Sequence, residues 1–239
     1  AISDDELKIA ENLKNIVIKD KELIGDEGVQ AGASQTIYTW VEKAPAKIKL
    51  QVKGGLISFY RDYGNVYIKL FSSKFPDRPV AEDRSVPPDG NPHEIVMETS
   101  YTGLHWFYIT TGGDRAKVKI LEPDMAWTFE SGITNRSFQP GTMWSLYFYV
   151  PKGTKIVAGY SDGGGGKILD GNGKEVFSFE QLPRYSYFKV NVPEGQDGTL
   201  WMFSKCNGNK ILLTVPPYLS VSKEKLLLPQ EVVERDLLR

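Results

Sequence analysis

Short stretches of alternating apolar and polar residues, separated by turn sequences, run through the second half of the chain. In the run LYFYV at 146–150, the first, third and fifth residues fall on one side of an extended backbone and the two tyrosines on the other. This period of two is typical of a β-strand. The sequences Pro-Lys-Gly at 151–153 and Pro-Glu-Gly at 193–195 are turn signals that end two such runs. Together they predict an antiparallel β-sandwich over residues 132–217.

The first half of the chain contains the same kind of pattern. It predicts strands at 36–42, 47–53, 65–72, 93–99, 103–110 and 116–122, which carry alternation or many β-branched and aromatic residues. These strands predict a first β-sandwich over residues 21–131. The length of 239 residues is enough for two units that each bury their own core. The expected fold class is therefore all-β, with two tandem antiparallel β-sandwiches.

The N-terminal segment, residues 1–20, has a different pattern. The sequence SDDE at 3–6 matches a capping box, and apolar residues follow it at helical spacing. Residues 3–14 are therefore predicted to form a short amphipathic helix. Such a helix is only marginally stable alone in water, so its apolar face must pack on something.

Residues 218–239 are predicted to form a C-terminal extension. Leu226, Leu227 and Leu228 are too apolar to remain in water. Two alternatives remain open for them: they dock onto a sandwich of this chain, or they contact a partner or a neighbouring domain. Pro229 suits the first turn of a helix that would follow.

Composition narrows the classes of partner. The chain has 29 basic and 30 acidic residues, for a formal net charge of −1, and it shows no basic stripe, so we expect no nucleic-acid partner. No apolar run approaches the roughly 18 residues that a membrane-spanning helix needs. Cys206 is the only cysteine, which excludes an intramolecular disulfide bond and a cysteine-rich metal site.

Two glycine-containing motifs allow a chemical interpretation. The sequence GYSDG at 159–163 matches the Gly-x-Ser-x-Gly pattern of serine hydrolases, but glycines continue to position 166, and His93 and His105 both precede it. The order of residues in such a triad therefore fails, and we predict no catalytic residue. The sequence DGNG at 170–173 is similar to the start of a calcium loop, yet it is also a strong hairpin signal, which we favour. We expect no cofactor, with a structural calcium ion as an open alternative.

Aromatic residues on strands are the candidate binding groups. Tyr38 and Trp40 share one face of their strand with Glu42, so we expect both to be partly exposed. Trp106 and His105 lie on opposite faces of their strand, and we interpret His105 as a hydrogen-bonded structural residue. Exposed aromatic rings stack on the C–H face of sugars, while nearby polar groups bind the sugar hydroxyls.

Asp114 is a polar candidate in the first half. It lies in the sequence GGDR at 112–115, which we predict to be a hairpin turn between two strands of the first sandwich. The candidate ligand-binding residues are therefore Tyr38, Trp40, Trp106 and Asp114.

Several segments resemble repeated segments of large exported bacterial proteins linked to polysaccharide breakdown. The sequence VPPDGNPHEIVMETSYTGLHWFYITTGGDR is similar to their first β-sandwich, and YFYVPKGTK, VPEGQDGTLW and VPPYLSVSKEKLLLPQEVVE are similar to their second sandwich and closing tail. The resembling stretches cover most of residues 46–234. The resemblance implies accessory modules of jelly-roll or pre-peptidase type, which commonly lie behind a glycosidase-like domain. It implies no catalytic or binding residue.

The expected function is that of a non-catalytic, carbohydrate-binding or carbohydrate-associated accessory module of an exported bacterial protein. Its expected partners are a polysaccharide or oligosaccharide and a neighbouring catalytic domain, and its expected location is extracellular, on the cell surface or in the periplasm. One alternative is a structural spacer, in which Leu226–Leu228 would bury against another domain. The other is a polysaccharide-degrading enzyme, which would need clustered acidic side chains in a concave face.

Overall fold

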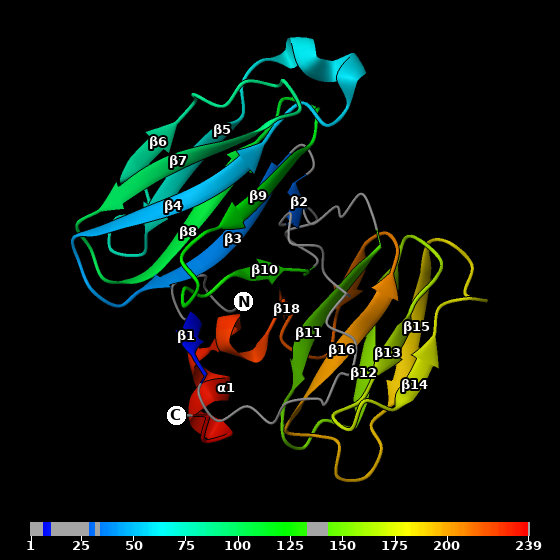
Figure 1. The fold of residues 1–239 in the computed structure, drawn as a ribbon. Helices are drawn as coiled ribbons and strands as arrows, with labels where there is room; N and C mark the ends of the chain where they lie inside the picture. Colours follow the sequence, from blue (N-terminus) through cyan, green and yellow to red (C-terminus); the bar gives the residue numbers. More distant parts are fainter. Residues whose placement is uncertain (1–6, 11–28, 32–33, 133–142, 239) are drawn as a thin grey trace.

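The chain folds into antiparallel β-sheets with little helix (Figure 1). The computed structural model describes residues 7–10, 29–31, 34–132 and 143–238. Within these residues the strands form four sheets of two, three, four and ten strands. The all-β prediction is confirmed, and all six strands predicted in the first half are present.

The ten-stranded sheet runs the length of the molecule, and we call it the long sheet (Figure 1). Its strands, in spatial order, are β14 (Glu175–Ser178), β13 (Lys167–Leu169), β16 (Thr199–Cys206), β11 (Trp144–Val150), β18 (Tyr218–Ser220), β10 (Thr128–Glu130), β3 (Ser34–Val41), β8 (Gly103–Thr110), β5 (Tyr67–Ser72) and β6 (Ala81–Asp83).

Two smaller sheets each face one part of the long sheet in a sandwich-like arrangement. The first contains β2 (Val29–Ala31), β9 (Ala116–Ile120), β4 (Ala46–Lys53) and β7 (Pro92–Thr99), and the second contains β15 (Ser186–Asn191), β12 (Ile156–Ser161) and β17 (Lys210–Leu212). Alternate residues are buried along β4, β7, β9, β12 and β15, as the period of two requires.

The long sheet joins the two halves of the chain through β10 and β18. Strand β10 pairs with β3 of the first half and with β18, and β18 pairs in turn with β11 of the second half. One hydrophobic cluster contains residues of both small sheets, such as Ile48 and Val190, and of the joining strands, such as Phe129 and Leu219. The expectation of two separate cores is therefore wrong, because the interior is continuous across the junction.

The N-terminal helix prediction is wrong where the structure can test it. Residues Leu7–Ile9 form a strand, β1, which pairs antiparallel with β19 (Leu227–Pro229) near the other end of the chain. A short isolated helix gains little stability in water, whereas this strand obtains backbone hydrogen bonds and buries Leu7 completely. The rest of the predicted helix, residues 3–6 and 11–14, lies outside the described residues.

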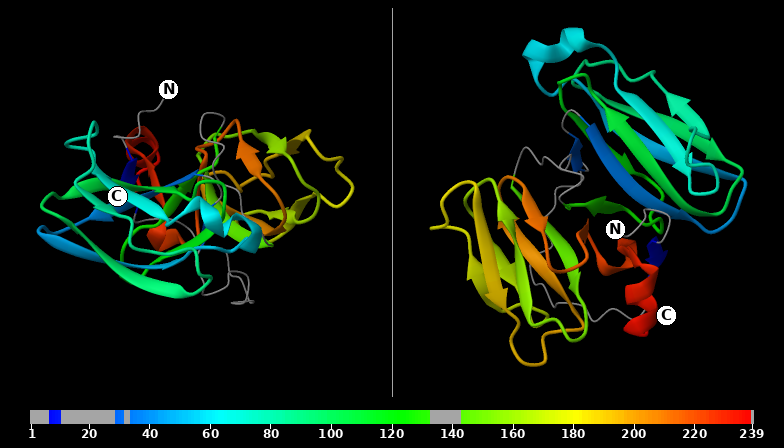
Figure 2. Two further views of the ribbon diagram at one scale, coloured as in Figure 1. Left: turned by 90° about the horizontal axis from the view of Figure 1, so that it is seen from above. Right: turned by 180° about the vertical axis from the view of Figure 1, so that it is seen from behind.

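The C-terminal segment covers the outer face of the long sheet, which is the face turned away from the small sheets. It contains the 3₁₀ turn Lys223–Lys225, β19 and helix α1 (Gln230–Arg235), and it lies beside β1 (Figures 1 and 2). Leu226–Leu228 are fully buried in a second hydrophobic cluster together with outer-face residues such as Tyr149. Docking onto this chain, the first of the two alternatives for these leucines, is therefore confirmed.

This cover explains why β11 is buried on both faces. Leu146, Phe148 and Val150 point into the interior cluster, as predicted, while Tyr147 and Tyr149 point into the cluster beneath the C-terminal segment. All seven residues of β11 are buried. The alternation predicted the two directions correctly, but the strand is not half-exposed.

Candidate functional site

The outer face of the long sheet carries a strip of aromatic residues beyond the edge of the C-terminal cover. We call Tyr67, Phe71, Trp106 and Tyr108 the aromatic strip. They lie on neighbouring strands β5 and β8, where Phe71 pairs with Trp106 across the strands. The residues that alternate with them on these strands are buried in the interior, so the strip residues face outward, as does Lys69 between Tyr67 and Phe71.

Two neighbouring rings of the aromatic strip stack on one another. The ring centroids of Phe71 and Trp106 are 5.7 Å apart and their planes differ by 10°. Tyr108 is 38 % exposed, and the other strip residues are half-buried. Rings held by cross-strand neighbours keep their orientation, so little conformational entropy is lost when a ligand stacks on them.

Charged side chains border one end of the aromatic strip. The Nζ atom of Lys69 lies 4.9 Å from the ring centroid of Tyr67, and the guanidinium carbon of Arg84 lies 3.8 Å from it. The Tyr67 hydroxyl donates a hydrogen bond to Glu82 Oε1 at 2.6 Å. The Tyr67 ring is thus already engaged by cations, whereas Tyr108 is the most exposed ring of the aromatic strip.

The structure places three of the four predicted binding residues on this face but leaves them unequally accessible. Trp106 belongs to the aromatic strip, and Trp40 is half-buried at the edge of the C-terminal cover, with Lys8 Nζ 5.4 Å from its ring. Tyr38 is only 1 % exposed. Its hydroxyl donates to Glu130 Oε2 at 3.2 Å. The expectation that Tyr38 is partly exposed is wrong, because the chain termini cover this part of the sheet.

Asp114, the fourth predicted residue, is buried in the connection between β8 and β9 and is not part of the aromatic strip. Its Oδ1 atom accepts hydrogen bonds from the backbone N–H groups of Ile57 and Arg115, at 2.8 and 2.7 Å. The turn at 112–115 does not form a hairpin, because β8 belongs to the long sheet and β9 to the four-stranded sheet. Asp114 therefore holds a connection between two sheets.

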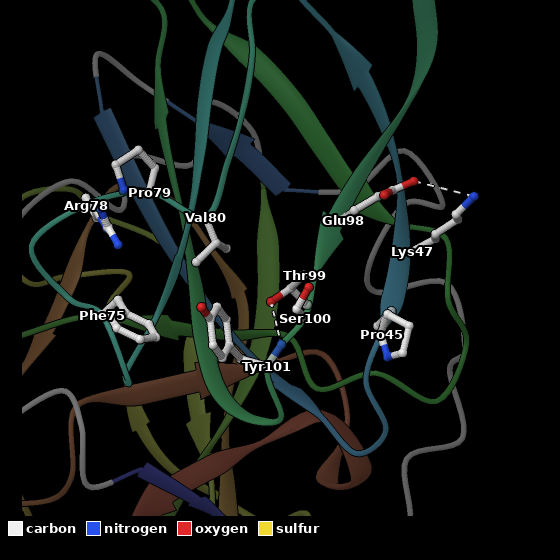
Figure 3. A pocket seen from close by; sticks show the side chains of 11 residues that line it. Pro45, Lys47, Phe75, Arg78, Pro79, Val80, Glu98, Thr99, Ser100 and Tyr101 are labelled. Carbon is white, nitrogen blue, oxygen red and sulfur yellow. Dashed lines mark hydrogen bonds and ion pairs between the residues drawn. The ribbon is translucent and has the colours of Figure 1, made fainter.

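A pocket of about 720 Å³ lies where the β5–β6 connection approaches the ends of β4 and β7 (Figure 3). Its lining residues are Pro45, Ala46, Lys47, Phe75, Arg78, Pro79, Val80, Glu98, Thr99, Ser100 and Tyr101.

Two aromatic rings and two kinds of charge meet in this pocket. The ring centroids of Phe75 and Tyr101 are 4.9 Å apart, and the guanidinium carbon of Arg78 lies 5.9 Å from the Phe75 ring. Lys47 Nζ forms an ion pair with Glu98 Oε1 at 3.4 Å, on the opposite side of the pocket (Figure 3). The pocket therefore combines stacking surfaces with hydrogen-bonding groups, which is the composition of small-molecule sites.

A buried histidine supports the wall of the pocket. His105 has no solvent exposure, and its Nδ1 donates to the Gly103 carbonyl at 3.0 Å, since that oxygen can only accept. Its Nε2 then accepts from the hydroxyl of Thr99, a pocket residue, at 2.8 Å. His105 is thus a hydrogen-bonded structural residue, as predicted, and burial lowers its pKa.

We expect the stability of this protein to fall as the pH drops below about 6.5, in part because of His105. Below this pH, His105 binds a proton in the unfolded chain but stays neutral in the folded protein. Protons therefore favour the unfolded state. Urea unfolding between pH 5 and 7 would measure this slope. His105→Gln should flatten it. An unchanged slope in His105→Gln would contradict the assignment.

The glycine-containing motifs serve local structure. Ser161 is buried, and its hydroxyl donates to the Gly163 carbonyl at 2.6 Å. The sequence at 170–173 forms the predicted hairpin between β13 and β14, in which Asp170 Oδ1 accepts from two backbone N–H groups. Over 7–10, 29–31, 34–132 and 143–238, no cluster of three or more His, Cys, Asp or Glu is placed to hold a metal ion.

Comparisons with known proteins add no relative. No protein-family model matches the chain, and a search of the curated proteins finds no significant match. In the part of the chain that the structure describes, no helix is both long and apolar enough to cross a membrane.

Sequence reasoning missed several of the residues that the fold brings together. Phe71 and Tyr108 could have been found, since each lies on the outward side of an alternating strand. Phe75 and Arg78 lie in the proline-rich connection, where no periodicity predicts a direction. Only the packing of this connection against β7 brings them to the pocket.

Proposed function

We propose that this chain is a non-catalytic carbohydrate-binding accessory region of an exported bacterial protein. The observation that carries the proposal is the aromatic strip, in which half-buried Trp106 and Phe71 stack nearly parallel at the edge of the C-terminal cover, beside the exposed Tyr108. Two near-parallel rings offer an extended apolar surface to the C–H faces of successive sugar rings. Thr36 and Lys69 pair with Tyr108 across the strands and supply groups that can hydrogen-bond sugar hydroxyls.

The proposal includes the wider architecture and setting. The two small sheets with the parts of the long sheet that they face would correspond to tandem sandwiches of jelly-roll or pre-peptidase type, at 21–131 and 132–217. The region would act outside the cell, on the cell surface or in the periplasm. It would hold a neighbouring catalytic domain near a polysaccharide.

Titration against a panel of plant and algal oligosaccharides tests the binding role. We expect at least one to bind, and Trp106→Ala to weaken that binding at least about tenfold, since a large stacking surface is lost. Tyr108→Ala tests the same surface at a more exposed position. Tyr187→Ala is the control, because this tyrosine is 74 % exposed in the other half of the chain.

Circular dichroism of each variant separates loss of binding from loss of fold. If no oligosaccharide binds, or if the strip variants bind as well as the control variant, the proposed function is wrong. The release of shorter products from the panel would instead favour the enzyme alternative.

A structural spacer is a second candidate, favoured by the long sheet that passes through both halves. Such continuity makes the halves resist relative movement. The form of this hypothesis in which Leu226–Leu228 bury against another domain is wrong, because they are buried in this chain. A spacer would bind no member of the panel.

A further inference from the structure

We infer that the pocket of Figure 3 is a second carbohydrate site, selective for a sugar residue that carries a carboxylate, that is, a uronic acid. The inference rests on the proposed function for the class of ligand, a glycan. It adds the pocket as a second site beside the aromatic strip, and it assigns a charge preference to the pocket.

The charge balance of the pocket favours an anion. Lys47 and Glu98 neutralise each other in their ion pair. Arg78 makes no ion pair with any residue that the structure describes, and no other acidic side chain lines the pocket. One positive charge is therefore uncompensated, which matches a ligand with a single negative charge per residue.

The position of Arg78 leaves its hydrogen-bond donors available. The guanidinium group lies near the Phe75 ring, a contact that uses the face of the ring and none of the N–H groups. A guanidinium group binds a carboxylate through two parallel N–H···O bonds, a geometry that fixes the orientation of the ligand. The carboxylate on a sugar ring would thus meet Arg78 while the ring stacks on the adjacent aromatic pair.

The remaining lining groups suit a sugar. Phe75 is 40 % exposed and touches Tyr101, so the two rings offer an apolar surface beside Arg78. Thr99 is held by His105, and it positions the backbone N–H of Tyr101 at 3.2 Å. Ser100 follows at the rim of the pocket, where its hydroxyl can bond a sugar hydroxyl. The volume of about 720 Å³ lies within the range of small-molecule sites.

Matched pairs of ligands test the inference. Oligomers of galacturonate, of glucuronate and of the alginate uronates would each be compared, by calorimetry, with the carboxyl-reduced counterpart that keeps the same ring. We expect at least one uronate oligomer to bind the wild-type protein about tenfold more tightly than its reduced counterpart. Arg78→Gln should remove that preference, whereas Trp106→Ala should weaken both members of the pair.

Arg184→Gln is the matched control variant. Arg184 also lies over an aromatic ring, that of Tyr185 at 5.3 Å, but in the second half of the chain. It should keep the preference for the uronate. Three results would overturn the inference while leaving the proposed function intact. They are equal binding of every uronate and its reduced counterpart, a preference that survives Arg78→Gln, and binding of sulfated oligosaccharides without uronates. If no oligomer of any kind binds, both fail together.

Discussion

Replacing Asp236 with alanine is expected to lower the free energy of unfolding by about 3 kcal/mol, because a buried donor and a partly buried donor lose their acceptor. Asp236 is 2 % exposed, and its Oδ2 atom accepts hydrogen bonds from the Tyr149 hydroxyl at 2.7 Å and the Lys152 backbone N–H at 2.9 Å. The Lys152 ammonium donates to the Asp236 carbonyl oxygen. These bonds tie the end of the C-terminal segment to β11 and the turn after it.

Urea unfolding followed by tryptophan fluorescence would measure this loss. Tyr149→Phe removes one donor together with its need for a partner, so it should cost only about 1 kcal/mol. In the double variant Asp236→Ala/Tyr149→Phe, the loss of unfolding free energy should be smaller than the sum of the two single losses, since both substitutions remove the same hydrogen bond. Exposed Asp124→Ala, the control, should change the free energy of unfolding by less than about 0.5 kcal/mol. Equal midpoints for Asp236→Ala and the control would refute the prediction.

The same contact gives a dependence on alkaline pH. Burial, followed by the hydrogen bond to Asp236, raises the pKa of Tyr149 above its usual value. The unfolded chain releases this proton near pH 10, whereas the folded protein retains it, so stability is lost as the pH rises beyond that point. Burial also raises the pKa of Cys206 to about 12, which acts in the same direction.

Replacing Lys210 with methionine is the second change with a large expected effect, a loss of about 3 kcal/mol, because two carbonyl oxygens lose a charged donor. Lys210 is fully buried, and its ammonium group donates to the carbonyl oxygens of Gly163 and Asn207 at 2.9 and 2.6 Å. It also lies 4.6 Å from the Phe179 ring centroid. Methionine fills a similar volume but leaves both carbonyl oxygens without their donor.

The effect of Lys210→Met should be concentrated in the glycine-rich loop that follows β12. Hydrogen exchange of residues 162–166 should accelerate, because the ammonium group holds this loop against the turn that contains Asn207. Lys189→Met is the control, since Lys189 is exposed on β15. If residues 162–166 of Lys210→Met exchange at the wild-type rate, Lys210 does not hold this loop.

The candidate site was only partly predictable. The outward direction of Trp106 was predictable because its neighbour His105 cannot share its face of the strand. Tyr38 was misjudged by the same reasoning, because the alternation gives the direction of a side chain and says nothing of what covers it. Arg78 was not found, since a connection without periodicity has no predictable face.

Alternation and turn residues were sufficient for the longer strands, the directions of their side chains and the all-β class, because these properties depend on residues two positions apart and on local backbone freedom. The pairing of β10 with both β3 and β18, the strand at Leu7–Ile9 and the burial of Tyr149 beneath Asp236 depend on contacts between residues that are far apart in the chain. No local pattern encodes such contacts. They form because the outer face of the long sheet is apolar and the leucines of the C-terminal segment gain the most by covering it.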